Sequence, residues 1–275
     1  MMLLNMKYIL GIIVVLIVIA GAYLVLAGNG GEKITIAGST SVQPVAEKLA
    51  EAYMKENPKV KITVQGGGTA VGVKSAQDGT ANIGTASSNS TAPGLNQYQI
   101  AKDGIVVIVN NGNSLSALTV DQAKNIFSGN VTTWTQVPGA SGSKIIVITR
   151  EAGSGTRDGF QSLVMGGKNG TQIVNTAIVQ SSTEAILQAV KGDPNAIGYI
   201  SLASLTSDVK AVKMNGVTAS EQTVSSGTYK LVRPFIFLTK GPATGETKKF
   251  IDWVLSPAGQ TIVKQSGAVP IGPTQ

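Results

Sequence analysis

The chain has 275 residues, of which 43% are hydrophobic and 13% charged, enough apolar content for one large folded domain or two smaller ones. Its net charge is +7, but Lys and Arg never occur more than two in a row, which argues against nucleic-acid binding. Cysteine and histidine are both absent, which excludes disulfides, zinc–thiolate sites, an N-terminal lipid on cysteine and a Ser-His-Asp triad. We therefore expect no enzymatic activity, and neither a cofactor nor a metal site.

The N-terminus carries a hydrophobic segment at residues 8–27, twenty residues without a charge. A helix of this length spans a hydrocarbon core of about 30 Å, and Lys7 before it places the N-terminus in the cytoplasm. We expect residues 1–32 to be a membrane anchor and tether, with the rest of the chain extracellular. The alternative is a cleaved signal peptide, which would release a secreted protein. Glycosylation of the N-x-S/T sequons at Asn89, Asn130 and Asn169 is left open.

In the first part of the chain, apolar runs alternate with amphipathic patterns. The expected elements are a strand at 33–38, a helix at 42–57, a strand at 60–65, a helix near 70–78, and strands at 81–87 and 104–110. Thr40 or Ser41 is the expected N-cap of the first helix, and Pro58 follows its end.

The second part repeats the alternation. The expected elements are a helix at 120–129, a strand at 144–150, a helix at 156–165, a strand at 177–180, a helix at 182–194, strands at 196–202 and 231–240, and helices near 244–255 and 257–265. Thr119 is the expected N-cap of the helix at 120–129. Alternating strands and helices predict an α/β fold with two lobes, each a mostly parallel sheet flanked by helices.

Four loops rich in glycine and hydroxyl groups follow predicted strands. They are GSTS (38–41), GGGTAVG (66–72), TASSNST (85–91) and EAGSGTRD (151–158). Ligands in open α/β sheets bind beyond the carboxyl ends of the strands, where helix N-termini offer free N–H groups to anions. Each loop alone is typical of an ordinary cap or turn, but four at strand ends favour an anion site.

Two of the three arginines in the chain, Arg150 and Arg157, lie at the fourth loop. Arg150 ends a strand and is the expected bidentate contact to the anion, although a surface pair with Glu151 is the alternative. Arg157 either binds the anion, faces solvent or pairs with Asp158. A Walker pattern is absent, which favours a small oxyanion over a nucleotide.

These motifs resemble the periplasmic-type phosphate-binding protein family, the substrate-binding proteins of phosphate ABC transporters. The resemblance covers residues 33–272 and lies in IAGSTSVQPVAEKLAEAY, VQGGGTAVG, IGTASS, REAGSGTRDGF, LTVDQAKNIFSGNVTTWTQV and FIDWVLSPAGQTIVKQSGAVPI. It implies a type II periplasmic-binding-protein fold with lobe one at 33–108 plus 234–275 and lobe two at 109–233. It also implies a monomer that delivers phosphate to the membrane subunits of the transporter.

The resemblance implies that phosphate is held between the lobes. The implied ligand residues are Thr40, Ser41, Thr69, Ser87, Ser88, Arg150, Ser154, Gly155 and Thr156. Some family members have an aspartate near position 88 that accepts the phosphate proton and rejects sulfate. Here Ser88 and Asn89 stand at that position, so Asp158 or Glu151 are the candidate acceptors. Sulfate, molybdate or tungstate binding, a phosphate sensor and a serine phosphatase remain the alternatives.

Overall fold

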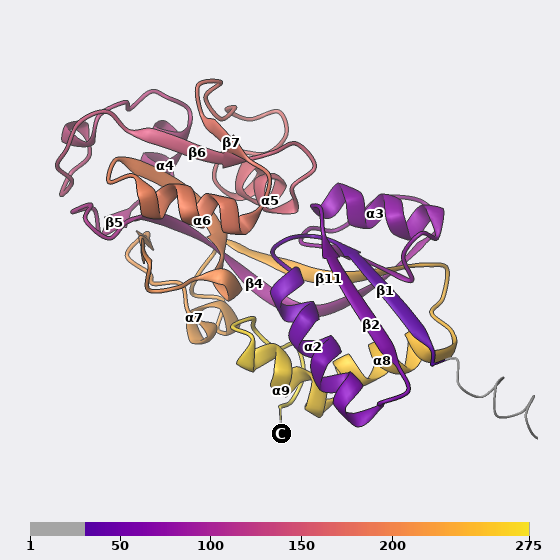
Figure 1. Cartoon of the computed structure of the whole chain (residues 1–275). Helices are drawn as coiled ribbons and strands as arrows, with labels where there is room; N and C mark the ends of the chain where they lie inside the picture. The colour runs from indigo at the N-terminus through magenta and orange to yellow at the C-terminus, as the bar shows by residue number, and fades with distance from the viewer. Residues whose placement is uncertain (1–30, 275) are drawn as a thin grey trace, which may run out of the picture.

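The computed structural model describes residues 31–274, and in them strands and helices alternate over two lobes (Figure 1). The first part of the chain forms β1 (Lys33–Gly38), α2 (Gln43–Glu56), β2 (Lys61–Gly66), α3 (Thr69–Asp78), β3 (Ile83–Ala86), β4 (Leu95–Asn110), β5 (Ala117–Leu118), α4 (Val120–Phe127), β6 (Ile146–Arg150) and α5 (Gly155–Leu163). The remainder forms β7 (Ile178–Gln180), α6 (Thr183–Gly192), β8 (Ala196–Ser201), β9 (Val209–Ala211), β10 (Lys213–Met214), α7 (Glu221–Ser225), β11 (Val232–Lys240), α8 (Gly245–Leu255) and α9 (Pro257–Gln265). Short 3₁₀ turns occupy Trp134–Gln136 and Leu202–Ser204.

One sheet runs through both lobes in the order β2-β1-β3-β11-β4-β8-β6-β7, with β9 also paired to β4. Strands β2, β1 and β3 are parallel in what we call the first lobe, and β8, β6 and β7 are parallel in the second lobe. The expectation of mostly parallel sheets holds for these two sets. The sheet as a whole is mixed, because β11 is antiparallel to both β3 and β4, and β4 is antiparallel to β8.

Strands β4 and β11 connect the two lobes (Figure 1). β4 pairs with β11 along its first part and with β8 from Ile105 to Val109. The sequence predicted only the apolar second part of β4, because residues 95–103 are mostly polar and show no continuous apolar run. A long antiparallel pair of this kind is the element about which two lobes can hinge.

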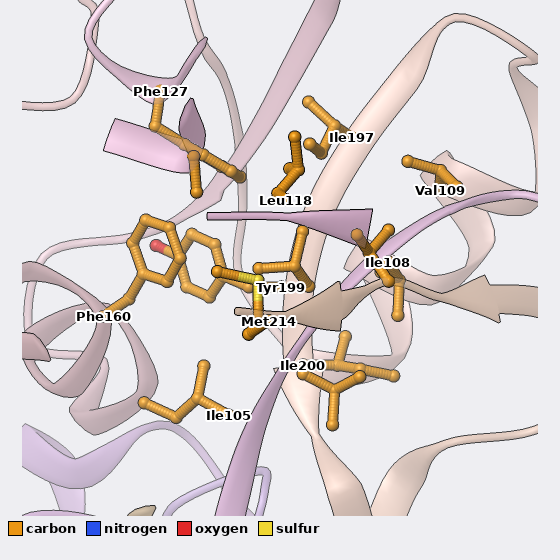
Figure 2. Packing of buried hydrophobic residues seen from close by; sticks show 14 of the residues in the cluster. Ile105, Ile108, Val109, Leu118, Phe127, Phe160, Ile197, Tyr199, Ile200 and Met214 are labelled. Carbon is orange, nitrogen blue, oxygen red and sulfur yellow. The ribbon is translucent and has the colours of Figure 1, made fainter. Parts of the chain in front are cut away.

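Each lobe has its own large hydrophobic core, and both cores include residues of β4. The core of the first lobe packs α2, α8 and α9 against the sheet, and includes Leu49, Tyr53 and Phe250. The core of the second lobe contains a stack of Phe160 from α5 on Tyr199 from β8, with ring centroids 4.1 Å apart (Figure 2). This stack fixes the position of α5, whose N-terminus faces the first lobe.

The N-cap predicted at Thr119 is confirmed, because its side chain accepts a hydrogen bond from Gln122 N. The predicted anchor at residues 8–27 lies outside the described residues. Within residues 31–274 the structure contains no helix that is both long enough and apolar enough to cross a bilayer. Asn89, Asn130 and Asn169 are all exposed.

Candidate anion-binding site

Hydroxyl side chains from both lobes meet where the lobes touch. In the first lobe they follow the carboxyl ends of β1, β2 and β3, and in the second lobe they lie at the N-termini of α5 and α6. We call this set the hydroxyl cluster, and its members are Ser39, Thr40, Ser41, Thr69, Ser87, Thr156 and Thr183.

Hydrogen bonds within the hydroxyl cluster cross from one lobe to the other. Ser41 Oγ lies 2.8 Å from Thr156 Oγ1 and 3.0 Å from Thr183 Oγ1. Thr40 Oγ1 is 3.4 Å from Thr183 Oγ1 and accepts a hydrogen bond from Thr183 N at 3.3 Å. Since hydroxyls both donate and accept, each can turn toward an anion placed between them.

The predicted capping of the first helix is wrong. Val42 occupies the N-cap of α2, and neither Thr40 nor Ser41 caps it, because their hydroxyls bond across the lobes instead. These hydroxyls therefore hydrogen-bond across the junction between the lobes and not to the N-terminus of α2.

The second and third loops are joined through Thr69 and Ser87. Ser87 N donates to Thr69 Oγ1 at 3.1 Å, and Ser87 Oγ lies 3.1 Å from Ser39 Oγ. Gly155 of the second lobe packs directly against this pair: a Cβ there would lie 2.4 Å from Thr69 Oγ1 and 2.6 Å from Ser87 Oγ. Only glycine lets the α5 backbone approach the first lobe so closely.

Arg150, at the end of β6, is buried and only 1% exposed. Its Nε and Nη2 donate to the two carboxylate oxygens of Glu151 at 2.8 Å each, and its Nη1 donates to Thr183 Oγ1 at 3.2 Å. The pairing with Glu151 that the sequence offered as an alternative is present, yet the guanidinium is not on the surface. One side of it is held by a carboxylate, and the other side faces the hydroxyl cluster.

The start of α5 presents backbone donors to the same place. Ser154 caps the helix by accepting from Arg157 N, and it is buried together with Gly155 and Thr156. In the described part of the chain, the backbone N–H groups of Gly155 and Thr156 have no protein acceptor. Free N–H groups and the positive end of a helix dipole favour an anion.

Three residues singled out from the sequence lie outside the hydroxyl cluster. Ser88 is half-buried, and Asp158 is exposed in the first turn of α5, where a carboxylate favours the helix dipole. Arg157 Nη1 donates to the carbonyl of Arg150 at 3.1 Å, so it neither faces solvent fully nor pairs with Asp158. The structure brings the other eight predicted residues to the junction of the lobes.

Four residues at the site were not predicted from the sequence: Ser39, Thr183, Asp103 and Arg233. Arg233 of β11 and Asp103 of β4 form a buried ion pair with Nη2 and Oδ2 2.9 Å apart, and Arg233 Nη1 donates to Thr156 Oγ1 at 2.7 Å. Asp103 Oδ1 also accepts from Ser201 Oγ at 2.7 Å. The scarcity of arginine was a signal, since Arg233 is the third of only three in the sequence.

Burial governs the ionisable groups around the cluster. It raises the pKa of the Asp103 carboxyl, an effect that the charge of Arg233 and the hydrogen bond from Ser201 oppose. It also lowers the pKa of the Arg233 guanidinium, which Asp103 counteracts. Burial likewise raises the pKa of the Tyr199 phenol, which therefore stays protonated and hydrogen-bonds Thr149 beside Arg150.

The chain is similar to known binding proteins over most of its length. A family model described as a PBP superfamily domain matches residues 27–258. The phosphate-binding protein PstS of Bacillus subtilis (strain 168) is 31% identical over 257 residues, which cover 89% of this chain and 84% of the relative.

Solved structures give the same result. A protein from Clostridium perfringens, described as a phosphate ABC transporter substrate-binding protein with bound phosphate, is 37% identical with a TM-score of 0.83, covering 88% of this chain and 100% of that chain. An ABC-type phosphate transport receptor from Vibrio cholerae is 33% identical with a TM-score of 0.70, covering 86% and 99%.

Proposed function

This chain belongs to the PBP superfamily and, within it, to the family of PstS phosphate-binding proteins, and we propose that it is the phosphate receptor of an ABC importer. The main support for this proposal is that hydroxyls from both lobes converge on one buried junction, with the Arg150 guanidinium on one side. Phosphate presents four oxygens in a compact tetrahedron, and this junction offers it hydrogen-bond donors from several directions.

The proposed ligand residues are those of the predicted set that the structure gathers at the junction. They are Thr40, Ser41, Thr69, Ser87, Arg150, Ser154, Gly155 and Thr156. Hydroxyls and Arg150 Nη1 supply side-chain donors, while Gly155 and Thr156 supply backbone N–H groups. Ser88 and Asp158 lie at the margin of this set.

Because the anion would bind between the two lobes, anion binding and lobe closure are coupled. Because Ser41 belongs to the first lobe and Thr156 to the second, an anion bonded to both holds the lobes together. A transporter subunit that recognises the closed form would then receive only loaded receptors.

We further propose that residues 8–27 anchor the receptor, with the globular part outside the cell. The uncharged length of this segment and Lys7 before it support the proposal. Retention of the full-length chain in the membrane pellet after an alkaline wash tests it, since a cleaved signal segment would leave the protein in the supernatant.

Isothermal calorimetry of the full-length chain with phosphate, sulfate and molybdate tests the main proposal. We expect phosphate to bind tightest, and Arg150→Lys to weaken binding at least about tenfold, because lysine cannot reproduce the guanidinium contacts. Arg157→Lys is the matched control, since within residues 31–274 the Arg157 side chain hydrogen-bonds only to a backbone carbonyl. Tighter binding of another oxyanion, or turnover of p-nitrophenyl phosphate, contradicts the proposal.

A further inference from the structure

Arg233 lies on one of the two strands that join the lobes, directly opposite Asp103 on the other strand. It is 4% exposed and Asp103 is fully buried. Arg233 Nε donates to Asp103 Oδ2 at 2.9 Å, which orients the guanidinium. The ion pair thus lies on the strands that connect the two lobes, in contact with the hydroxyl cluster.

The outer nitrogen of this guanidinium reaches both lobes. Arg233 Nη1 donates to Ser87 Oγ of the first lobe at 3.2 Å and to Thr156 Oγ1 of the second at 2.7 Å. Both hydroxyls belong to the proposed ligand set. Arg233 therefore contacts the same groups that would contact the anion.

The other outer nitrogen of the guanidinium is paired with Asp103 by charge but has no acceptor at hydrogen-bond geometry among the described residues. In the described residues, Arg233 Nη2 is buried without a hydrogen-bond acceptor of suitable geometry, although it lies 2.9 Å from Asp103 Oδ2. Buried donors without acceptors are costly and rare in folded proteins. An oxyanion beside Ser87 and Thr156 is the kind of group such a cation favours.

Arg150 and Arg233 have matching arrangements on two sides of the hydroxyl cluster. Each has a carboxylate partner, Glu151 or Asp103, and each directs Nη1 at cluster hydroxyls. A path of hydrogen bonds runs from Arg150 Nη1 through Thr183, Ser41 and Thr156 to Arg233 Nη1. The anion would lie between two guanidiniums rather than beside one.

We propose that Arg233 is a second anion-binding arginine, which donates from the hinge strand to the same phosphate as Arg150. This inference rests on the proposed function. Because Arg233 also contacts Ser87 and Thr156, which belong to opposite lobes, it links anion binding to closure of the two lobes.

The test is the phosphate dissociation constant of the full-length chain carrying Arg233→Lys. Lysine keeps the charge opposite Asp103 but has one nitrogen, which cannot serve Asp103 and the anion together. We expect binding to weaken about tenfold to hundredfold, the range for one charge-assisted hydrogen bond. The unfolding temperature measured without phosphate should change little from wild type. The increase in unfolding temperature on adding phosphate should be smaller in the variant than in wild type. Arg157→Lys is the control and should bind within about threefold of wild type.

A neutral pair, Asp103→Asn with Arg233→Gln, decides the matter if Arg233→Lys does not fold, because it leaves no unpaired charge. We expect the same loss of affinity. Wild-type affinity in the folded Arg233 variant, together with lost affinity in Arg150→Lys, overturns the role of Arg233 and leaves the proposed function intact. If wild-type protein binds no phosphate by calorimetry, both proposals fall.

Discussion

The hydroxyl oxygens of Ser41 and Thr156 lie 2.8 Å apart, although 115 residues separate them in the chain. Ser41 follows β1 in the first lobe, and Thr156 lies in the first turn of α5 in the second. If both bind the same anion, their contributions to affinity depend on each other. This pair is the most direct link between ligand binding and lobe closure.

We expect Ser41→Ala and Thr156→Val each to weaken phosphate binding about fivefold to thirtyfold, as loss of one buried hydrogen bond would. The fold-loss of phosphate affinity in the double variant should differ from the product of the two single fold-losses by a factor of about two or greater, in either direction. A double-mutant cycle measured by calorimetry checks this. Strictly multiplicative losses would show that the two hydroxyls do not share a ligand.

Gly155→Ala tests the close approach of α5 to the first lobe. The added methyl group would lie within 2.6 Å of two hydroxyl oxygens, those of Thr69 and Ser87, which must turn away from the site. We expect phosphate binding to weaken about tenfold or more.

Gly192→Ala is the matched control, because in the described part of the chain no heavy atom outside its neighbours and its own helix backbone lies within 4 Å of a Cβ there, and the glycine also belongs to a helix, α6. It should bind phosphate normally and be as stable as wild type or more so. Equal phosphate affinity in Gly155→Ala and Gly192→Ala would contradict the importance of the contact.

Thr183→Val removes a hydroxyl that bonds Arg150, Ser41 and Thr40 together. The isosteric valine keeps the packing but leaves Arg150 Nη1 without this acceptor. We expect phosphate affinity to fall about tenfold. Exposed Thr176→Val is the control, and isothermal calorimetry is the measurement. Unchanged affinity in Thr183→Val would exclude this threonine from the site.

Local sequence patterns predicted most helices and strands, because the formation of these elements depends largely on residues close together in the chain. The strand at Lys33–Gly38 and the helix at Gln43–Glu56 follow from apolar runs and periodic apolar positions. The hydroxyl-rich loops were found for the same reason, since glycine and serine next to a strand end form a local signal.

What the sequence could not supply depends on contacts between distant segments. Thr183 follows Ser182, which caps α6, so the segment resembles any ordinary helix start. Its role arises only when the second lobe meets Ser41, 142 residues away. Arg233 was likewise hidden within a strand pattern, because its partner Asp103 is known only once β11 and β4 are paired.

Acid should weaken the first lobe through Glu246. Hydrogen bonds from Tyr53 and Lys249 hold the pKa of Glu246 below its usual value. A carboxylate with a depressed folded-state pKa stabilises the fold above its unfolded pKa, about 4.3, and loses this effect as the pH falls further.

Urea unfolding should therefore show Glu246→Gln less stable than wild type at pH 7, by at most about 1 kcal/mol, and the difference should be smaller at pH 3. Glu184→Gln serves as control, because Glu184 is exposed and bonds only Gln188 through its side chain. A stability difference for Glu246→Gln that is the same at both pH values would refute the assignment.

Selectivity between phosphate and sulfate is expected to depend on Glu151. Of the two carboxylates that the sequence offered as proton acceptors, Asp158 is exposed, whereas Glu151 holds Arg150 and lies beside the second loop, with Oε1 3.2 Å from where a Cβ on Gly68 would be. A carboxylate can accept the proton of monohydrogen phosphate but opposes fully ionised sulfate.

Glu151→Gln should therefore lower the ratio of phosphate to sulfate affinity about tenfold. Loosening of Arg150 in this variant affects both anions alike, so the ratio isolates the acceptor from the ion pair. Asp158→Asn should leave the ratio unchanged in competition titrations. A reduced ratio in Asp158→Asn but not in Glu151→Gln would assign the acceptor to Asp158 instead.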